Sequence, residues 1–307
     1  MPRLLGPRWH AFTHGLFRNS DEAETREIFD RVERLFARHG LTADGARDDL
    51  VAEISGGVLA TFDLPPRHNQ AGPVAALVAR LLDYEDMFVL PEIDWTERRS
   101  ITQWWELRDA LNHQRPFVAD FEGTKRRLGQ AIVDFLAPLY DATPTLVAPP
   151  GDETDITIAT DLVNSIAGVS DVAEAALATV FDEDLGKDGL FGRTADRLER
   201  NLIAASGGNP AAPKRFSRAP KLPTKSDIKN PDELLATYLG GTPLLDYFRQ
   251  KIDFSIPTTS RFEHHHIVAG SGHGKTQTLQ YLIGQDLDAV AAGKRTVIVL
   301  DSQGDLI

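Results

Sequence analysis

The chain has 307 residues, and its 33 Lys and Arg against 45 Asp and Glu give a formal net charge of −12. With 42% hydrophobic and 25% charged residues it has the composition of a globular protein, which excludes wholesale disorder. It has no cysteine, so disulfides, thiolate metal sites and a cysteine nucleophile are excluded. The acidic balance argues against a protein that coats nucleic acid through its bulk charge.

The sequence shows no membrane segment. A spanning helix needs roughly 18 or more apolar residues, and the most apolar window, residues 71–82, is interrupted by Arg80. The N-terminus has basic residues but no apolar stretch of signal-peptide length. We therefore expect a soluble, cytoplasmic protein without a membrane partner.

Residues 1–206 predict a helical domain, with a break near 143–157 that could separate two subdomains. The clearest helix is 20–39, where Asn19 or Ser20 can cap the start and Gly40 can end it. Its apolar residues recur at helical spacing. Further helices are expected near 44–61, 72–85, 98–112, 122–140, 158–167, 170–181 and 190–205, with a break around 186–192.

Residues 207–230 predict a basic, proline-rich linker. Residues 210–230 hold six basic residues against Asp227, a net charge of +5, whereas residues 1–209 carry −14 and residues 231–307 carry −3. The plainer interpretation is a stiff, solvated connector between domains. The alternative is a strap that contacts nucleic-acid phosphates or an acidic partner surface.

Residues 231–307 predict the beginning of an α/β P-loop domain. A helix over 231–250, broken at 240–243, precedes an extended stretch at 254–257. A strand at 264–269, a glycine-rich turn, a helix at 275–292 and a strand at 296–301 then form a βαβ unit, with Gly293 placed to end the helix. The β-branched run in 297–300 is typical of a strand buried on both faces.

The glycine-rich turn matches the phosphate-binding pattern GxxxxGK[ST], except that Ala269 takes the place of the first glycine. Glycines let successive backbone N–H groups converge on a phosphate, and the following helix adds its unpaired N–H groups and positive dipole end. Lys275 can bridge the β- and γ-phosphates of ATP. The candidate nucleotide-binding residues are Ala269, Gly270, Ser271, Gly272, His273, Gly274, Lys275, Thr276 and Gln277.

Two residues are candidates for Mg²⁺. The hydroxyl of Thr276 stands where the motif places its magnesium ligand. Asp301 ends an apolar strand, as a Walker B carboxylate does, but it follows Lys275 by only one helix and one loop. We therefore favour a role for Asp301 at the edge of the site, or in turn formation with Gly304, over Mg²⁺ binding.

Other features favour structural roles. Of His264, His265 and His266, at most two can share one face of a strand, so a metal site is the less favoured interpretation. Trp104 and Trp105 lie in a predicted helix without a surrounding basic cluster, which favours packing over base stacking.

Residues 254–307 resemble the start of the ATPase domain in the HerA–FtsK superfamily of DNA-translocating motors and in the coupling ATPases of type IV secretion and conjugation. The resemblance lies in Ile256-Pro, Arg261-Phe-x-His264, the loop 269–276 and the run Val-Ile-Val-Leu-Asp301-x-x-Gly-Asp305. It implies a RecA-like core, ATP and Mg²⁺ as cofactors, and a homo-oligomer, a hexamer, acting on DNA.

Two departures from the family matter. The chain lacks the N-terminal membrane helices usual in secretion-coupling proteins, which favours a soluble motor. It also ends at Ile307, before the family's Walker B carboxylate, polar sensor and arginine finger, so no catalytic residue is identifiable. We expect the N-terminal part of a longer protein that hydrolyses ATP when complete. The alternatives are a nucleotide-dependent switch or small-molecule kinase, and an adaptor whose nucleotide site is structural.

Overall fold

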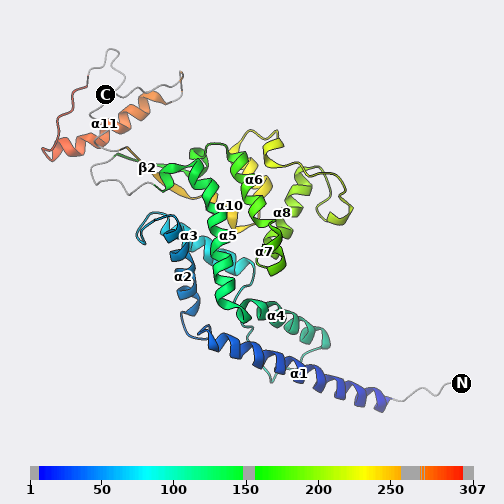
Figure 1. Ribbon diagram of the computed structural model, residues 1–307. Helices are drawn as coiled ribbons and strands as arrows, with labels where there is room; N and C mark the ends of the chain where they lie inside the picture. Colours follow the sequence, from blue (N-terminus) through cyan, green and yellow to red (C-terminus); the bar gives the residue numbers. More distant parts are fainter. Residues whose placement is uncertain (1–6, 148–155, 257–269, 271, 273, 300–307) are drawn as a thin grey trace. The chain divides into compact units, whose positions relative to one another are not determined.

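The computed structural model describes residues 7–147, 156–256, 270, 272 and 274–299 (Figure 1). The chain divides into two compact units. Unit 1 comprises Met1–Val147 and Leu162–Gln250, and unit 2 comprises Ala148–Asp161 and Lys251–Ile307. No helix in the described ranges is both long and apolar enough to cross a membrane.

Unit 1 is helical, as the sequence predicts. Its α-helices are α1 (Pro7–Arg38), α2 (Ala46–Thr61), α3 (Ala71–Tyr84), α4 (Ile101–Ala119), α5 (Phe121–Ala142), α6 (Val169–Val180), α7 (Glu183–Asp188), α8 (Gly192–Ala205), α9 (Pro231–Leu239) and α10 (Pro243–Phe248). Short 3₁₀ turns are η1 (Pro144–Leu146), η2 (Leu162–Ser165), η3 (Pro213–Arg215) and η4 (Pro223–Lys225). Unit 2 holds β1 (Ile156–Asp161), β2 (Lys251–Ile256) and α11 (Lys275–Ala291).

The core of unit 1 is organised around α5, which packs against α2 and α6 (Figure 1). Leu128, Ile132, Leu136 and Leu139 recur at helical spacing on α5, and each is at most 1% exposed. Burying a side chain of this size contributes roughly 1.5–3 kcal/mol. The stripe therefore supplies much of the free energy that keeps the helices together.

The first helix differs from its expected bounds. Helix α1 begins at Pro7, so Asn19 and Ser20 lie inside it and do not cap it. Its end is as expected, because Gly40 adopts φ 72° just beyond it. An interior Asn or Ser is tolerated where tertiary contacts support the helix, and α1 packs along α4.

A cluster of aromatic and charged side chains joins α1 to α4. Arg108 of α4 pairs with Asp21 and Glu24 of α1, at 2.9 Å for Asp21. Trp104 is 3% exposed and stacks on Trp95 with ring centroids 6.1 Å apart, which confirms a packing role for Trp104. Its neighbour Trp105 is 64% exposed, so the packing role does not extend to it.

The helix expected at 158–167 is wrong. Residues 156–161 form β1, which pairs antiparallel with β2 in the register Ile156 to Ile256 and Asp161 to Lys251, and residues 162–165 form η2. Four of the five residues in the run Ile-Thr-Ile-Ala-Thr are β-branched. Such a run favours a strand once a partner is available, and the partner lies about 90 residues away in the sequence.

The break expected around 186–192 is also shorter than predicted. Helix α7 occupies its first part, because the side chain of Asp182 accepts hydrogen bonds from the N–H groups of Asp184 and Leu185. Gly189, at φ 69°, ends the helix. A side-chain cap of this kind is enough to hold a single helical turn or two.

Residues 207–250 group with the helices of unit 1 rather than with unit 2. Helices α9 and α10 pack on α8, α6 and α3, and the segment 207–230 lies against α8 and α6. The structure thus divides the chain at residues 147–162 and at residue 250, whereas the sequence suggests a connector at 207–230.

A buried polar chain links α10 to the rest of unit 1. The Tyr247 hydroxyl donates to Oε1 of Gln70 at 2.7 Å and accepts from the Tyr140 hydroxyl at 3.0 Å. Burial raises the pKa of Tyr140 to about 12 and also raises the pKa of Tyr247. Both phenols therefore keep their protons at neutral pH and act as donors, which satisfies groups that would be costly to bury alone.

Candidate functional site

The candidate site is the glycine-rich turn that leads into α11. Gly270, Gly272 and residues 274–277 are described, while Ala269, Ser271 and His273 lie outside the described residues. Gly272 has φ 78° and Gly274 has φ 72°. These left-handed conformations are readily adopted only by glycine, and alternation of backbone conformation in such turns makes successive N–H groups converge on an anion.

The turn passes directly into a helix whose start is open. Helix α11 begins at Lys275, and Gly274 occupies the N-cap position without a side-chain cap. The first backbone bond of the helix runs from the N–H of Thr278 to the carbonyl of Gly274 at 2.8 Å. The N–H groups of residues 275–277 precede this bond, so they have no acceptor within the helix and carry the positive end of its dipole.

The two side chains expected to hold ATP and Mg²⁺ are accessible at this point. Lys275 and Thr276 occupy the first two positions of α11, and both are exposed, as is Gln277. The ammonium group of Lys275, the hydroxyl of Thr276 and the free N-terminal N–H groups of α11 therefore lie next to one another in the sequence. This donor set suits a phosphate together with a hard cation, which takes oxygen ligands.

The end of α11 is fixed by contacts that the sequence only partly predicts. Gly293 has φ 70°, and the N–H of Lys294 returns to the carbonyl of Ala289 at 2.9 Å, as expected for a glycine that ends a helix. In addition, the Arg295 guanidinium pairs at 2.8 Å with Asp286, which is 7% exposed. This ion pair holds the residues that follow α11 against the helix.

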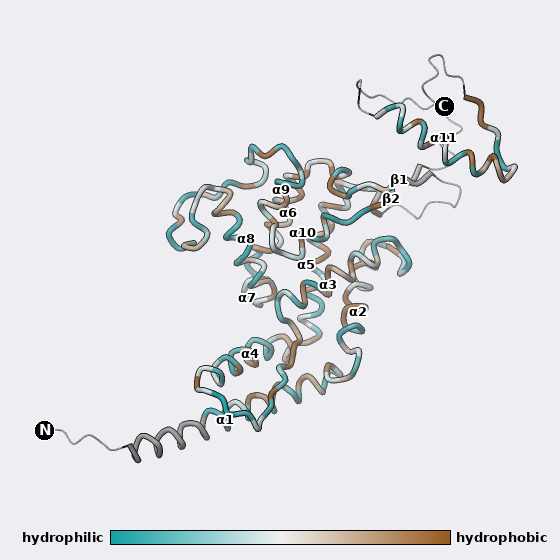
Figure 2. The backbone as a smooth tube through the Cα atoms, turned by 180° about the vertical axis from the view of Figure 1, so that it is seen from behind, coloured by the Kyte–Doolittle hydropathy of each residue, from teal (hydrophilic) through white to brown (hydrophobic). Residues whose placement is uncertain are grey.

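The strand expected at 296–301 is not formed in its described part. Residues 296–299 have neither helical nor strand structure, and Ile298 is 80% exposed. Figure 2 shows this stretch beyond the end of α11 coloured as hydrophobic. A β-branched run becomes a buried strand only when neighbours pair with it and cover its faces. The expected βαβ unit is therefore represented in the described residues by its turn and helix alone.

Several remaining expectations concern residues outside the described ranges. These are Asp301, the strand at 264–269 and the histidines 264–266. In the part of the chain that is described, no group of three or more His, Asp or Glu side chains is arranged to hold a metal ion.

A groove in unit 1 offers a contrasting environment. It lies between α2 and α5 and encloses about 530 Å³. Its lysine, Lys125, is paired with Glu53 at 2.6 Å and Glu122 at 3.0 Å and lies over the ring of Phe121. The ammonium is thus neutralised within the protein, which distinguishes it from the exposed Lys275.

In comparisons with known proteins, no family model, no curated protein and no solved structure matches this sequence. The resemblance to DNA-translocating ATPases therefore rests on the motif residues of 254–307 alone.

Proposed function

We propose that this chain binds ATP and Mg²⁺ through residues 269–277 and is the N-terminal part of a DNA-translocating ATPase. The observation that carries the proposal is the turn Gly-Ser-Gly-His-Gly-Lys-Thr, with Gly272 and Gly274 left-handed, leading into the uncapped start of α11. No other arrangement in the described residues combines glycine backbone, helix start, lysine and threonine in this way.

The chemistry assigned to the site is binding and charge neutralisation. The Lys275 ammonium binds the β- and γ-phosphates, and the backbone N–H groups at the start of α11 bind phosphate oxygens. The Thr276 hydroxyl is a ligand for Mg²⁺, which supplies the positive charge that offsets the triphosphate. None of these residues is a general base, so hydrolysis requires residues other than the ones named here.

The proposed motor function is tested with the protein encoded by the complete gene. We expect ATP hydrolysis that increases at least several-fold when DNA is added, because a translocase couples turnover to its track. The measurement is phosphate release with and without duplex DNA at saturating ATP. If DNA does not change the rate of ATP hydrolysis, the motor function is contradicted and a nucleotide-dependent switch is supported. Binding of ATP without any hydrolysis would support an adaptor.

The role of Thr276 in holding Mg²⁺ is tested separately. Thr276→Ala should weaken Mg²⁺-dependent binding of a fluorescent ATP analogue by about tenfold, the low end of what metal-site substitutions cost, while binding in EDTA stays the same. Thr276→Ser is the matched control, because it keeps the hydroxyl and should retain the Mg²⁺ dependence. Equal losses with and without Mg²⁺ in the alanine variant would assign Thr276 to the phosphates instead.

A further inference from the structure

The residues 210–229, called here the basic segment, run from the end of α8 back to α6 within unit 1 (Figure 1). The segment is ordered against the helices in spite of its four prolines and its charge. The question is which of its side chains pack on the helices and which are exposed to solvent. The six basic residues are Lys214, Arg215, Arg218, Lys221, Lys225 and Lys229.

One anchor of the basic segment is aromatic. The ring of Phe216 packs so closely on Gly208 that a Cβ on this glycine would lie 2.7 Å from the ring and 2.7 Å from Ile203. Real Cβ atoms do not approach other atoms so closely, so the glycine is required for the contact. Phe216 is consequently half-buried rather than displayed on the surface.

Further anchors are hydrogen bonds to the backbone of the basic segment. The N–H of Lys221 donates to Oγ of Ser206 at 2.7 Å, and the carbonyl of Lys221 accepts from the Tyr238 hydroxyl at 2.9 Å. The N–H and the hydroxyl of Thr224 both donate to Glu174 of α6. These bonds fix the path of the main chain at two points.

Two of the cations are used inside the protein. The Arg218 guanidinium donates to the carbonyl of Ser206 and lies 5.5 Å from the ring centroid of Phe216. Lys221 forms an ion pair with Asp227 at 2.6 Å. These two residues hold the basic segment in its conformation. The other cations of the segment can therefore contact an external ligand.

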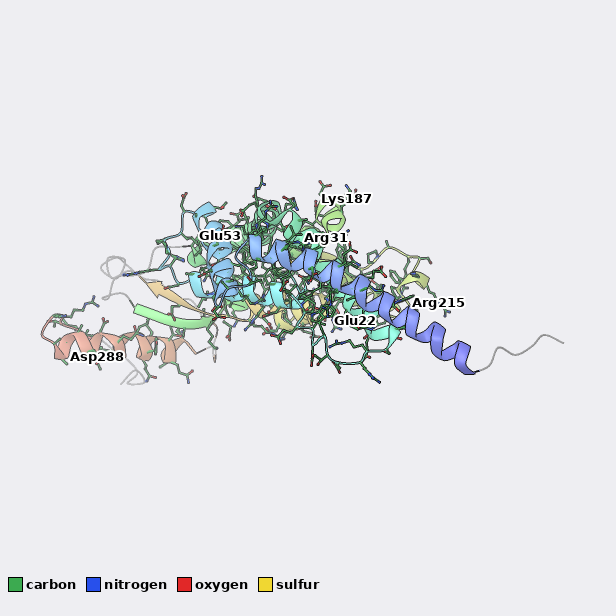
Figure 3. All side chains as sticks on the ribbon, turned by 90° about the horizontal axis from the view of Figure 1, so that it is seen from below. Glu22, Arg31, Glu53, Lys187, Arg215 and Asp288 are labelled. Atoms are coloured by element: carbon green, nitrogen blue, oxygen red, sulfur yellow. The ribbon has the colours of Figure 1, made fainter. Side chains whose placement is uncertain are left out.

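The remaining cations point into solvent. Lys214, Arg215, Lys225 and Lys229 are all exposed, and Arg215 is labelled in Figure 3. Within the described residues no ion pair engages Lys214, Arg215 or Lys225. Because the backbone beneath them is held in place, binding a ligand through these side chains requires no further ordering of the main chain.

We propose that the basic segment binds the phosphate backbone of nucleic acid. Its exposed cations are spaced along the segment, with Lys214 and Arg215 in η3, Lys225 in η4 and Lys229 beyond it. A series of charges along one segment suits a linear polyanion. Its large apolar side chains Phe216, Leu222 and Ile228 are turned at least partly inward, so it displays no apolar anchor of the kind that dominates protein interfaces. Lysine, which is depleted at protein interfaces, is a regular phosphate contact in nucleic-acid complexes.

The acidic remainder of the chain limits this binding to the basic segment. Residues 1–209 carry a net charge of −14, which repels a polyanion. This repulsion is screened beyond about 8 Å at physiological salt. Binding is therefore expected to be weak without the exposed cations, steeply dependent on salt and independent of nucleotide, so it does not rest on the ATP site.

The test is fluorescence anisotropy of labelled single-stranded and duplex DNA with the full chain, without nucleotide, over a range of salt concentrations. The variant Lys214→Gln, Arg215→Gln, Lys225→Gln is expected to lose at least about tenfold in affinity at moderate salt. The slope of log affinity against log salt should fall by up to roughly 3, since each phosphate contact contributes about 0.9. The anchors Arg218 and Lys221 are unchanged, so circular dichroism should show the wild-type fold.

The matched control is Arg34→Gln, Arg115→Gln, Lys187→Gln, which changes the net charge by the same amount at exposed positions outside the basic segment; Lys187 is labelled in Figure 3. Its affinity for DNA should stay near that of the wild type. Equal losses in both triple variants, or no binding by the wild type at low salt, would overturn the proposal. Competition by polyglutamate as effective as that by DNA would also overturn it and assign the segment to an acidic protein.

Discussion

Substituting Lys275 by alanine is expected to reduce the affinity for a fluorescent ATP analogue about 100-fold or more. Charge-assisted hydrogen bonds contribute roughly 1.5–3 kcal/mol each, and the ammonium is placed to contact two phosphates. The exposure of Lys275 at the first position of α11 means that its removal leaves no cavity. The loss therefore measures ligand contacts rather than stability.

The control for this experiment is Lys294→Ala. Lys294 is exposed and lies just beyond the other end of α11, so it changes the charge of unit 2 equally without touching the glycine turn. Its affinity for the analogue should match the wild type. Unchanged affinity in Lys275→Ala would remove the basis for the nucleotide site, whereas a similar loss in both variants would point to a nonspecific effect of charge.

The second large effect is expected for stability, at Glu85. This residue follows α3 and is only 2% exposed. Its carboxylate accepts from the N–H of Arg193 at 2.9 Å, from the N–H of Thr194 at 2.8 Å and from the Thr194 hydroxyl. Helix α8 begins at Gly192 without a side-chain cap of its own. A residue more than 100 positions away therefore caps α8 and opposes its dipole.

Glu85→Ala should lower the free energy of unfolding by about 3–5 kcal/mol, since it leaves the buried N–H and hydroxyl of Thr194 and the partly buried N–H of Arg193 without their acceptor. Glu85→Gln keeps one acceptor oxygen and should cost about 1–2 kcal/mol. The measurement is urea unfolding followed by far-UV circular dichroism.

Glu33→Ala, at an exposed position of α1, serves as the control and should change stability by no more than about 0.5 kcal/mol. If Glu85→Ala were as stable as this control, the carboxylate would not be capping α8 in solution. If Glu85→Gln were as damaging as the alanine variant, the negative charge itself, rather than the acceptor geometry, would be the main contribution.

The local pattern of the sequence was sufficient for most helices. The spacing in 44–61, 72–85, 122–140 and 170–181 predicted α2, α3, α5 and α6 to within a few residues. Helical periodicity is a short-range signal, and in these segments it agrees with the face that each helix buries. For the candidate site, the pattern GxxxxGK[ST] predicted the position of the glycine-rich turn and the start of α11 at Lys275.

The failures occur where distant residues decide the structure. Residues 156–161 become a strand because residues 251–256 pair with them. The apolar run at 296–299 has strand propensity, but Ile298 is 80% exposed, so propensity alone does not produce a strand. From the sequence alone, Glu85 looks like an exposed carboxylate at the end of a helix. It becomes a buried N-terminal cap of α8 only because α8 packs beside it.

Local sequence is sufficient to predict the helical character of the N-terminal region and the glycine turn with Lys275 and Thr276, and it gives the charges −14, +5 and −3 of three successive segments. Tertiary structure decided the pairing of β1 with β2, the capping of α8 by Glu85, and the docking of residues 207–230 on α8 and α6. Composition and periodicity reflect interactions between residues that are close together in the sequence. Which charges are buried, paired or left in solvent depends on contacts between residues far apart in the sequence.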